Sequence, residues 1–237
     1  EEAERWGGIL RRLPDLSVNS ENVLMLSPDD TLRESHRHHA HLMAVYPLRL
    51  LKAERSERER QIIEASIADL EKYGRGLWVG YSYAWAAAIY ACAGNGDAAL
   101  YHLKQMWDHM CSPNGFHLNG DFRNVGMSFF HYRPFTLEGN FAAVDALQEM
   151  LLRTDGGVIR PFPAIPADWR RKVVAFDDFR GEYGVRVSSR LSSGKPEYVR
   201  LYAERDGAFK VLNAFGTNRL VLEGPGAASE GISAASS

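Results

Sequence analysis

Apolar residues recur at helical intervals through the first two thirds of the chain. A short helix is expected over 6–13. A second begins after Ser56, which has the capping-box spacing to Glu59, and stops at Gly74. The apolar face of this second helix is formed by Ile63, Ile67 and Leu70. The pattern therefore predicts helices with one buried side near the start of the chain.

The next two predicted helices are separated by a short glycine-containing turn. One covers about 81–93, is rich in alanine and aromatic residues, and is closed by Gly94. Asp97 is expected to cap the following helix, whose apolar positions are Leu100, Leu103, Met106, Trp107 and Met110. Helix pairs joined by short turns are typical of a helical toroid or solenoid.

A long connection over 111–138 leads to one more predicted helix. Long ordered loops in compact domains are usually functional. This loop delivers Glu138 to the start of a helix that runs from about Asn140 to near Thr154. An acid at that position either serves as a general base or only complements the helix dipole. Both interpretations of Glu138 are open at this point.

The pattern changes after the paired glycines at 156–157. A proline-rich segment follows, and then short runs of β-branched and aromatic residues separated by turn signals at 193–194 and 206–207. These runs predict antiparallel strands at 172–176, 183–188, 198–203, 209–212 and 219–222. We therefore expect a helical domain over 1–156, a β-sandwich over 157–224 and a disordered tail over 225–237.

Composition narrows the classes of function. Hydrophobic residues make up 45% of the 237 residues and charged residues 24%, which is ordinary for a globular protein. The net charge of −2 argues against binding to nucleic acid or to an anionic membrane. No segment approaches the roughly 18 consecutive apolar residues of a membrane span. The 2 cysteines are too few for a disulfide framework.

The first residues read as the middle of a longer chain. The sequence opens at Glu1 with no initiator methionine and no signal-like segment, so we interpret it as a fragment. Localisation is left open between the cytoplasm and a secreted or periplasmic setting.

Half of the 8 histidines fall at 36, 38, 39 and 41. Their spacing is compatible with zinc, yet no HExxH pattern or cysteine pair supports a metal. Imidazoles also exchange hydrogen bonds with sugar hydroxyls, and buried histidines are common. We favour substrate contact without any metal or cofactor.

Aromatic residues are dense around the predicted helix start at 81. Core packing explains most of them. Trp78 and Tyr81, which lie beside Gly76 and Gly80, are the better candidates for the lip of a ligand cleft.

Four segments resemble glycoside hydrolase family 95 in order and spacing. HRHHAHL at 36–42, with YP at 46–47, resembles that family's HRHxSHL…YP segment. GYSYAW at 80–85 resembles GWSxAW, and FTLEGNF at 135–141 resembles FQIDGNF. GGVIRPFPAIPADW at 156–169 resembles the passage into the family's C-terminal β domain. Together the four motifs are fairly specific.

The resemblance implies part of an (α/α)6 toroid followed by a small antiparallel β-sandwich. It also implies inverting hydrolysis of α-L-fucosides or α-L-galactosides. Glu138 stands where the family has its DGN aspartate, and His38 or a neighbour stands at a substrate-contacting histidine. The QEW-like acid segment has no match at 25–30, so Asp29, Asp30 or Glu34 would stand in.

These arguments give a set of expected site residues. The catalytic candidates are Glu138, Asp29 and Glu34. The expected sugar contacts are His36, His38, His41, Trp78, Tyr81, Arg133 and Asn140. The expected partner is a carbohydrate, and the runner-up is a non-catalytic or degenerate carbohydrate-binding relative. A helical scaffold for protein partners is the weaker third class.

Overall fold

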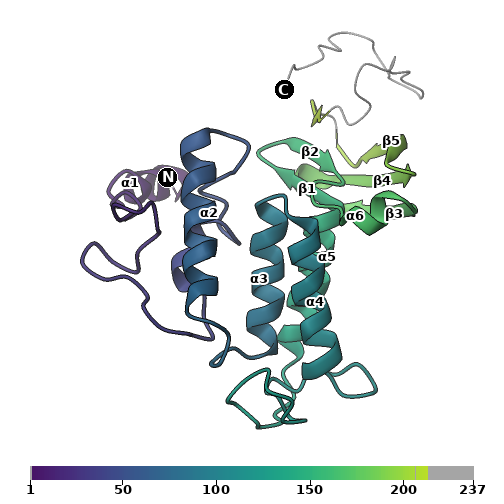
Figure 1. The fold of residues 1–237 in the computed structure, drawn as a ribbon. Helices are drawn as coiled ribbons and strands as arrows, with labels where there is room; N and C mark the ends of the chain where they lie inside the picture. The colour runs from purple at the N-terminus through teal and green to yellow at the C-terminus, as the bar shows by residue number, and fades with distance from the viewer. Residues whose placement is uncertain (1, 206, 213–237) are drawn as a thin grey trace.

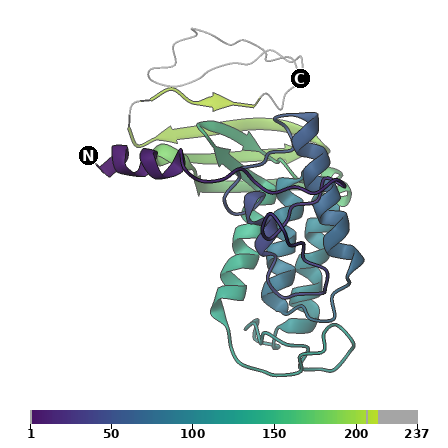
Figure 2. The ribbon, with the colours of Figure 1, turned by 90° about the vertical axis from the view of Figure 1, so that its left-hand side faces the viewer.

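The computed structural model describes residues 2–205 and 207–212 and places a group of helices beside two small sheets (Figure 1). Turned by 90°, the strands lie across one end of the helices (Figure 2). The helices are α1 (Glu2–Leu10), η1 (Ala40–Ala44), α2 (Glu57–Lys72), α3 (Gly80–Cys92), α4 (Gly96–Met110), α5 (Leu137–Leu151), α6 (Ala167–Arg170) and η2 (Glu182–Gly184). The strands are β1 (Leu152–Asp155), β2 (Val158–Pro161), β3 (Val173–Arg180), β4 (Val185–Ser192), β5 (Lys195–Ala203) and β6 (Lys210–Val211).

The α2 boundaries follow the local sequence signals. Ser56 is the N-cap, and its side chain accepts a hydrogen bond from the Glu59 backbone N–H at 3.2 Å. Gly74 follows the helix with a φ of +68°, a left-handed conformation that glycine adopts without strain. The expected cap and stop of this helix are both confirmed.

The central element of the helical core is α3, which packs against both α4 and α5. It is apolar on nearly every side, and its alanines let the neighbouring helices approach closely. The fully buried side chains around it include Trp78, Tyr83, Ile89, Leu103 and Met106. The helix with little polar face is therefore the innermost one, as the sequence predicts.

Two helix ends differ from expectation. The N-cap of α4 is Asn95, which accepts from the Ala98 N–H at 3.0 Å, whereas Asp97 accepts from the Ala167 N–H at 2.9 Å. Asp97 thus fastens the segment before α6 to the helical core instead of capping α4. The helix that begins at Glu138, α5, ends at Leu151 and not near Thr154.

The strand structure begins earlier than the glycine pair suggests. The strand β1 pairs antiparallel with β2, and Asp155 lies opposite Val158 across Gly156 and Gly157. Both glycines have positive φ, as a tight two-residue hairpin requires. Pairing with β2 therefore overrides helix continuation at Leu152.

Within the described residues, the β part contains two three-stranded sheets with the orders β1-β2-β6 and β3-β4-β5. The second sheet is antiparallel throughout, as expected, whereas β2 and β6 run parallel. Apolar residues between the sheets form a second core, which includes Ile159, Phe176, Val187 and Leu191. The expected strand at 219–222 and the expected tail at 225–237 lie outside the described residues.

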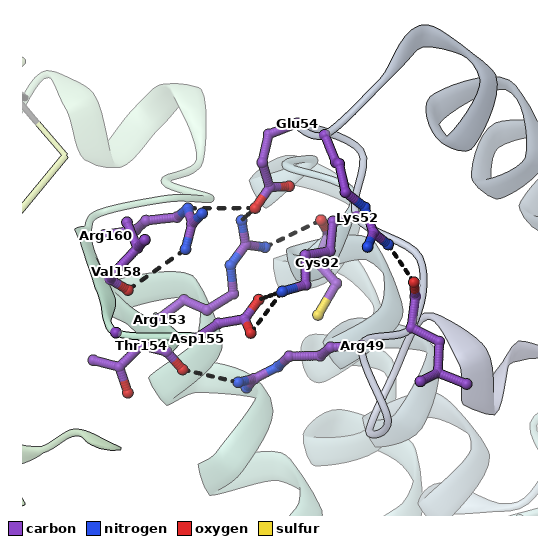
Figure 3. Close-up of polar contacts among 12 residues, drawn as sticks. Arg49, Lys52, Glu54, Cys92, Arg153, Thr154, Asp155, Val158 and Arg160 are labelled. Atoms are coloured by element: carbon purple, nitrogen blue, oxygen red, sulfur yellow. Dashed lines mark hydrogen bonds and ion pairs between the residues drawn. The ribbon is translucent and has the colours of Figure 1, made fainter. Parts of the chain in front are cut away.

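Charged side chains join the loop before α2 to the β1–β2 hairpin (Figure 3). Lys52 Nζ lies 2.7 Å from Asp155 Oδ2. Glu54 Oε1 lies 3.0 Å from Arg153 Nη2 and 3.3 Å from Arg160 Nε. This ionic cluster ties the helical part to the sheets at their common boundary.

None of the described helices is both long and apolar enough to span a bilayer.

Candidate active site

A cavity of about 290 Å³ opens between α3 and α5. Its lining residues recur at three- and four-residue intervals, so each helix contributes one face. The lining consists of Tyr46, Tyr81, Ala84, Trp85, Glu138, Phe141, Ala142 and Asp145. The segment 80–85 and the segment 135–141 thus meet at one site although they are distant in sequence.

Glu138 lies in the first turn of α5, two residues after the N-cap Thr136. Its side chain is exposed and belongs to the cavity lining. The backbone N–H groups of a first helical turn favour negative charge nearby. The expectation that Glu138 begins a helix is confirmed, and the carboxylate can meet a ligand in the cavity.

Asp145 is the second carboxylate of this lining, and the sequence reasoning did not single it out. It lies seven residues after Glu138 on the same helix face, about 10 Å further along the axis at 1.5 Å per residue. Desolvation within the structure raises the pKa of Asp145 above its usual range. The seven-residue spacing was the signal that could have revealed it.

Aromatic rings wall the cavity. The Trp85 indole N–H donates to the Tyr46 carbonyl oxygen at 3.1 Å, and the rings of Trp85 and Tyr81 pack edge to face with centroids 6.0 Å apart. Tyr81 therefore lies where the sequence interpretation put it. Trp78 does not, because it is fully buried with its ring centroid 4.7 Å from that of His39. The role of Trp78 is to fill the core.

The four clustered histidines do not line the cavity. His39 is fully buried with Nε2 3.0 Å from the Ser82 carbonyl oxygen, and burial lowers its pKa to about 3. His41 is also buried, and this desolvation lowers its pKa to about 4. Of the alternatives, buried neutral histidine describes these two.

The other two histidines lie nearer the surface. His36 Nδ1 accepts from the His38 N–H at 3.1 Å. Their segment is fastened to the start of α3, because the Ser82 hydroxyl donates to the Arg37 carbonyl oxygen at 2.6 Å. The segment with His36 and His38 therefore lies beside the N-terminal end of α3, which carries Tyr81.

The candidate acids and the remaining candidate contacts lie elsewhere. Asp29 and Glu34 are exposed and are not part of the lining. Arg133 is exposed, with its guanidinium carbon 5.8 Å from the centroid of the Phe122 ring. Asn140 uses its amide within the chain, since Nδ2 donates to the Gly115 carbonyl oxygen at 2.9 Å. Asn140, in the first turn of α5, thus holds the preceding loop in place and is not part of the lining.

Asp121, a further carboxylate on the connection that leads to Glu138, is committed to its own loop. Its buried carboxylate accepts from the Val125 N–H at 3.1 Å and from the Met127 N–H at 2.8 Å. Burial acts to raise the pKa of Asp121, but these amide hydrogen bonds outweigh it and hold the pKa below its usual range. A carboxylate so occupied shapes the loop instead of accepting a proton from water.

Within the described ranges, histidine, cysteine, aspartate and glutamate side chains nowhere gather in threes in a way that could hold a metal ion. The chemistry that the cavity offers comes from carboxylates and aromatic walls. This combination suits a neutral ligand with hydroxyl groups and apolar ring faces.

Comparison with known proteins identifies the family of the chain. The model of the glycosyl hydrolase family 95 catalytic domain matches residues 1–151, and it ends where α5 ends. The chain is also similar to Alpha-L-fucosidase 2 of Arabidopsis thaliana, at 27% identity over 192 residues. That alignment covers 76% of this chain and 22% of the relative, so the chain spans about a fifth of that protein's length. The chain belongs to glycosyl hydrolase family 95.

Proposed function

We propose that this chain is the C-terminal part of a helical-toroid glycosidase domain together with a β-sandwich domain. The complete protein would hydrolyse α-L-fucoside or α-L-galactoside-like linkages of oligo- or polysaccharides with inversion. The main support is Glu138, which opens into an aromatic-walled cavity at the position of the family's DGN motif. Family membership and the fucosidase relative support the same reaction class.

In this reaction Glu138 acts as the base. It takes a proton from a water molecule, and the resulting hydroxide forms a bond to the anomeric carbon from the face opposite the leaving group. The bond from that carbon to the glycosidic oxygen breaks, and a carboxylic acid protonates the departing oxygen. The carboxyl groups of inverting enzymes lie about 6.5–9.5 Å apart, which leaves room for the water.

The acid must stand across the bond from Glu138. Asp145 does not satisfy this requirement, because it lies on the same face of the same helix. We therefore assign the acid to a residue outside this lining, and Asp29 and Glu34 stay the candidates from the sequence. The aromatic side chains Tyr81, Trp85 and Phe141 would pack against the apolar faces of the sugar ring.

A second candidate function is carbohydrate binding without catalysis. One observation favours it: among the described residues of the lining, none places a carboxylate opposite Glu138. The two functions differ in what happens when Glu138 loses its charge.

The deciding experiment replaces Glu138 by Gln in the complete protein. With catalysis, turnover of an α-L-fucoside should fall by about 10²–10⁴-fold while sugar binding persists, because a positioned base typically contributes that much. Glu138→Asp tests the placement of the carboxylate, since it restores the family's residue but shortens the side chain. Glu64→Gln, an exposed acid of α2, is the matched control. Near-normal turnover by Glu138→Gln would refute the assignment.

Two further measurements support the test. The anomer released first, followed by proton NMR, should be inverted relative to the substrate. Chelators should leave activity unchanged if no metal takes part. Loss of activity on chelation that zinc restores would contradict the metal-free assignment of the histidines.

A further inference from the structure

His117 fills the space between the two helix ends that carry the cavity walls. It lies on the 111–136 connection and is fully buried. A Cβ atom added to Gly80, the first residue of α3, would overlap His117 Nε2. A Cβ added to Gly139, in the first turn of α5, would overlap Nδ1. The imidazole therefore occupies the room that these two glycines leave free.

Hydrogen bonds from His117 bracket Glu138 on both sides. The His117 N–H donates to Asn140 Oδ1 at 3.0 Å, and the Thr136 N–H donates to the His117 carbonyl oxygen at 3.2 Å. His117 Nδ1 lies 2.9 Å from the Thr136 carbonyl oxygen and 2.7 Å from its hydroxyl. Thr136 and Asn140 stand two residues before and two residues after Glu138, so one residue fixes both flanks of the carboxylate.

The Thr136 carbonyl oxygen favours the tautomer of His117 in which Nδ1 carries the hydrogen, because a carbonyl oxygen can only accept. Nε2 is buried and has no hydrogen-bond partner among the described residues. A second proton there would be a buried, unpaired charge. Burial accordingly lowers the pKa of His117, although the Thr136 carbonyl and the Glu138 carboxylate act to raise it.

We propose that His117 is a positioning residue that holds the first turn of α5, and with it Glu138, at a fixed place against α3. This inference rests on the proposed function of Glu138. It predicts a specific kinetic signature, because His117 is not part of the cavity lining. Displacing a catalytic group by about 1 Å can cost on the order of 10² in rate without loss of substrate contacts.

Two substitutions in the complete protein separate positioning from simple packing. In His117→Asn the amide nitrogen can reach the place of Nδ1 and keep the bond to Thr136. In His117→Gln the longer side chain puts its amide near the place of Nε2 and loses that bond. We expect kcat to fall about 10²-fold in the Gln variant and less than about 10-fold in the Asn variant, with KM within about 3-fold in both. If His117 only packs in the core, the loss of kcat in each variant should instead parallel its loss of thermal stability.

Combination with Glu138→Gln gives the sharper measurement. If His117 acts through Glu138, adding His117→Gln to Glu138→Gln should lower kcat by less than about 3-fold more. Multiplicative losses, an unchanged kcat in His117→Gln, or an effect on KM alone would each overturn the proposal. Failure of both His117 variants to fold would overturn it as well, in favour of a purely structural role.

The outcome is distinguishable from failure of the proposed function. If the wild-type protein cleaves no α-L-fucoside or α-L-galactoside, the proposed function fails. The same pair of variants is then compared by L-fucose affinity, measured calorimetrically. Non-additive losses of affinity would still show that His117 acts through Glu138. Additive losses would overturn the positioning role.

Discussion

Glu149 offers a direct test of the electrostatics where the helices meet the sheets. It lies in the last turn of α5, is 5% exposed, and its carboxylate pairs with the Arg49 guanidinium. The Cys92 thiol donates to its other oxygen at 3.9 Å. The Arg153 guanidinium donates to the Cys92 carbonyl oxygen at 3.1 Å, so it lies at the same junction as Arg49 (Figure 3). The substitution that probes it with least change of shape is Glu149→Gln.

The expected magnitude follows from the shift of the pKa of Glu149. Burial raises this pKa from 4.5 to about 7, with Arg49 and Arg153 opposing the shift and Asp145 and Asp155 adding to it. Between these two values the folded state binds the proton more tightly than the unfolded state. Stability therefore falls as the pH rises from about 4.5 to about 7, by about 1.4 kcal/mol per unit. The whole loss is about 3 kcal/mol and is complete above that range.

The assay compares urea unfolding of the wild type and of Glu149→Gln at pH values between 5 and 8. The Gln side chain stays neutral and can still accept from Arg49, so its stability should lack this decline. The wild type should lose about 2.5 kcal/mol relative to the variant across this range, because the first part of the decline lies below pH 5. Glu64→Gln, which removes an exposed acid, should follow the wild type. A wild type that gains stability relative to Glu149→Gln as the pH rises would show that the Arg49 pair keeps Glu149 ionised, and would refute the reasoning.

Two further substitutions test the loop and the packing of the helices. Asp121→Asn should lower the free energy of unfolding by about 1–3 kcal/mol, because an amide offers one acceptor oxygen where the carboxylate offers two. The lowered pKa of Asp121 stabilises the wild type at neutral pH, and this stability is lost as the pH falls below about 4. Urea unfolding of Asp121→Asn should not show this loss. Gly96→Ala should reduce the melting temperature, since its Cβ would overlap the Ala164 backbone. Gly8→Ala in the exposed α1 should leave the melting temperature unchanged or raise it.

The helices could be predicted from the sequence where caps and periodicity agree. Ser56 and Gly74 mark the ends of α2 because cap chemistry is local. The end of α5 could not be read in this way, since Leu151 and Leu152 continue an apolar run that suits either structure. What decides it is pairing with Val158–Pro161, a contact made by residues further along the chain.

The candidate site was predictable in part. Glu138 and Tyr81 line the cavity, because helix starts and motif order are encoded locally. His39 and Trp78 show the opposite case, since composition cannot distinguish a ring that packs in the core from one that faces a ligand. Asp145 was missed because it belongs to no recognised motif. It reaches the cavity only because the face of α5 that carries Glu138 packs toward α3.

The three residues 138–140, which resemble the family's DGN motif, have different structural roles. In the tripeptide 138–140, Gly139 makes room for His117 and Asn140 binds the backbone N–H of the same residue. Glu138 is the member of the three that lines the cavity. Two of the three positions thus encode the placement of the helix end, and they keep the letters of the family motif. The departure from the family, Glu for Asp, falls on the position that lines the cavity. If Glu138 activates water as proposed, a side chain one methylene group longer would move that water without disturbing the scaffold. We therefore expect this exchange to affect the sugar accepted and not the fold.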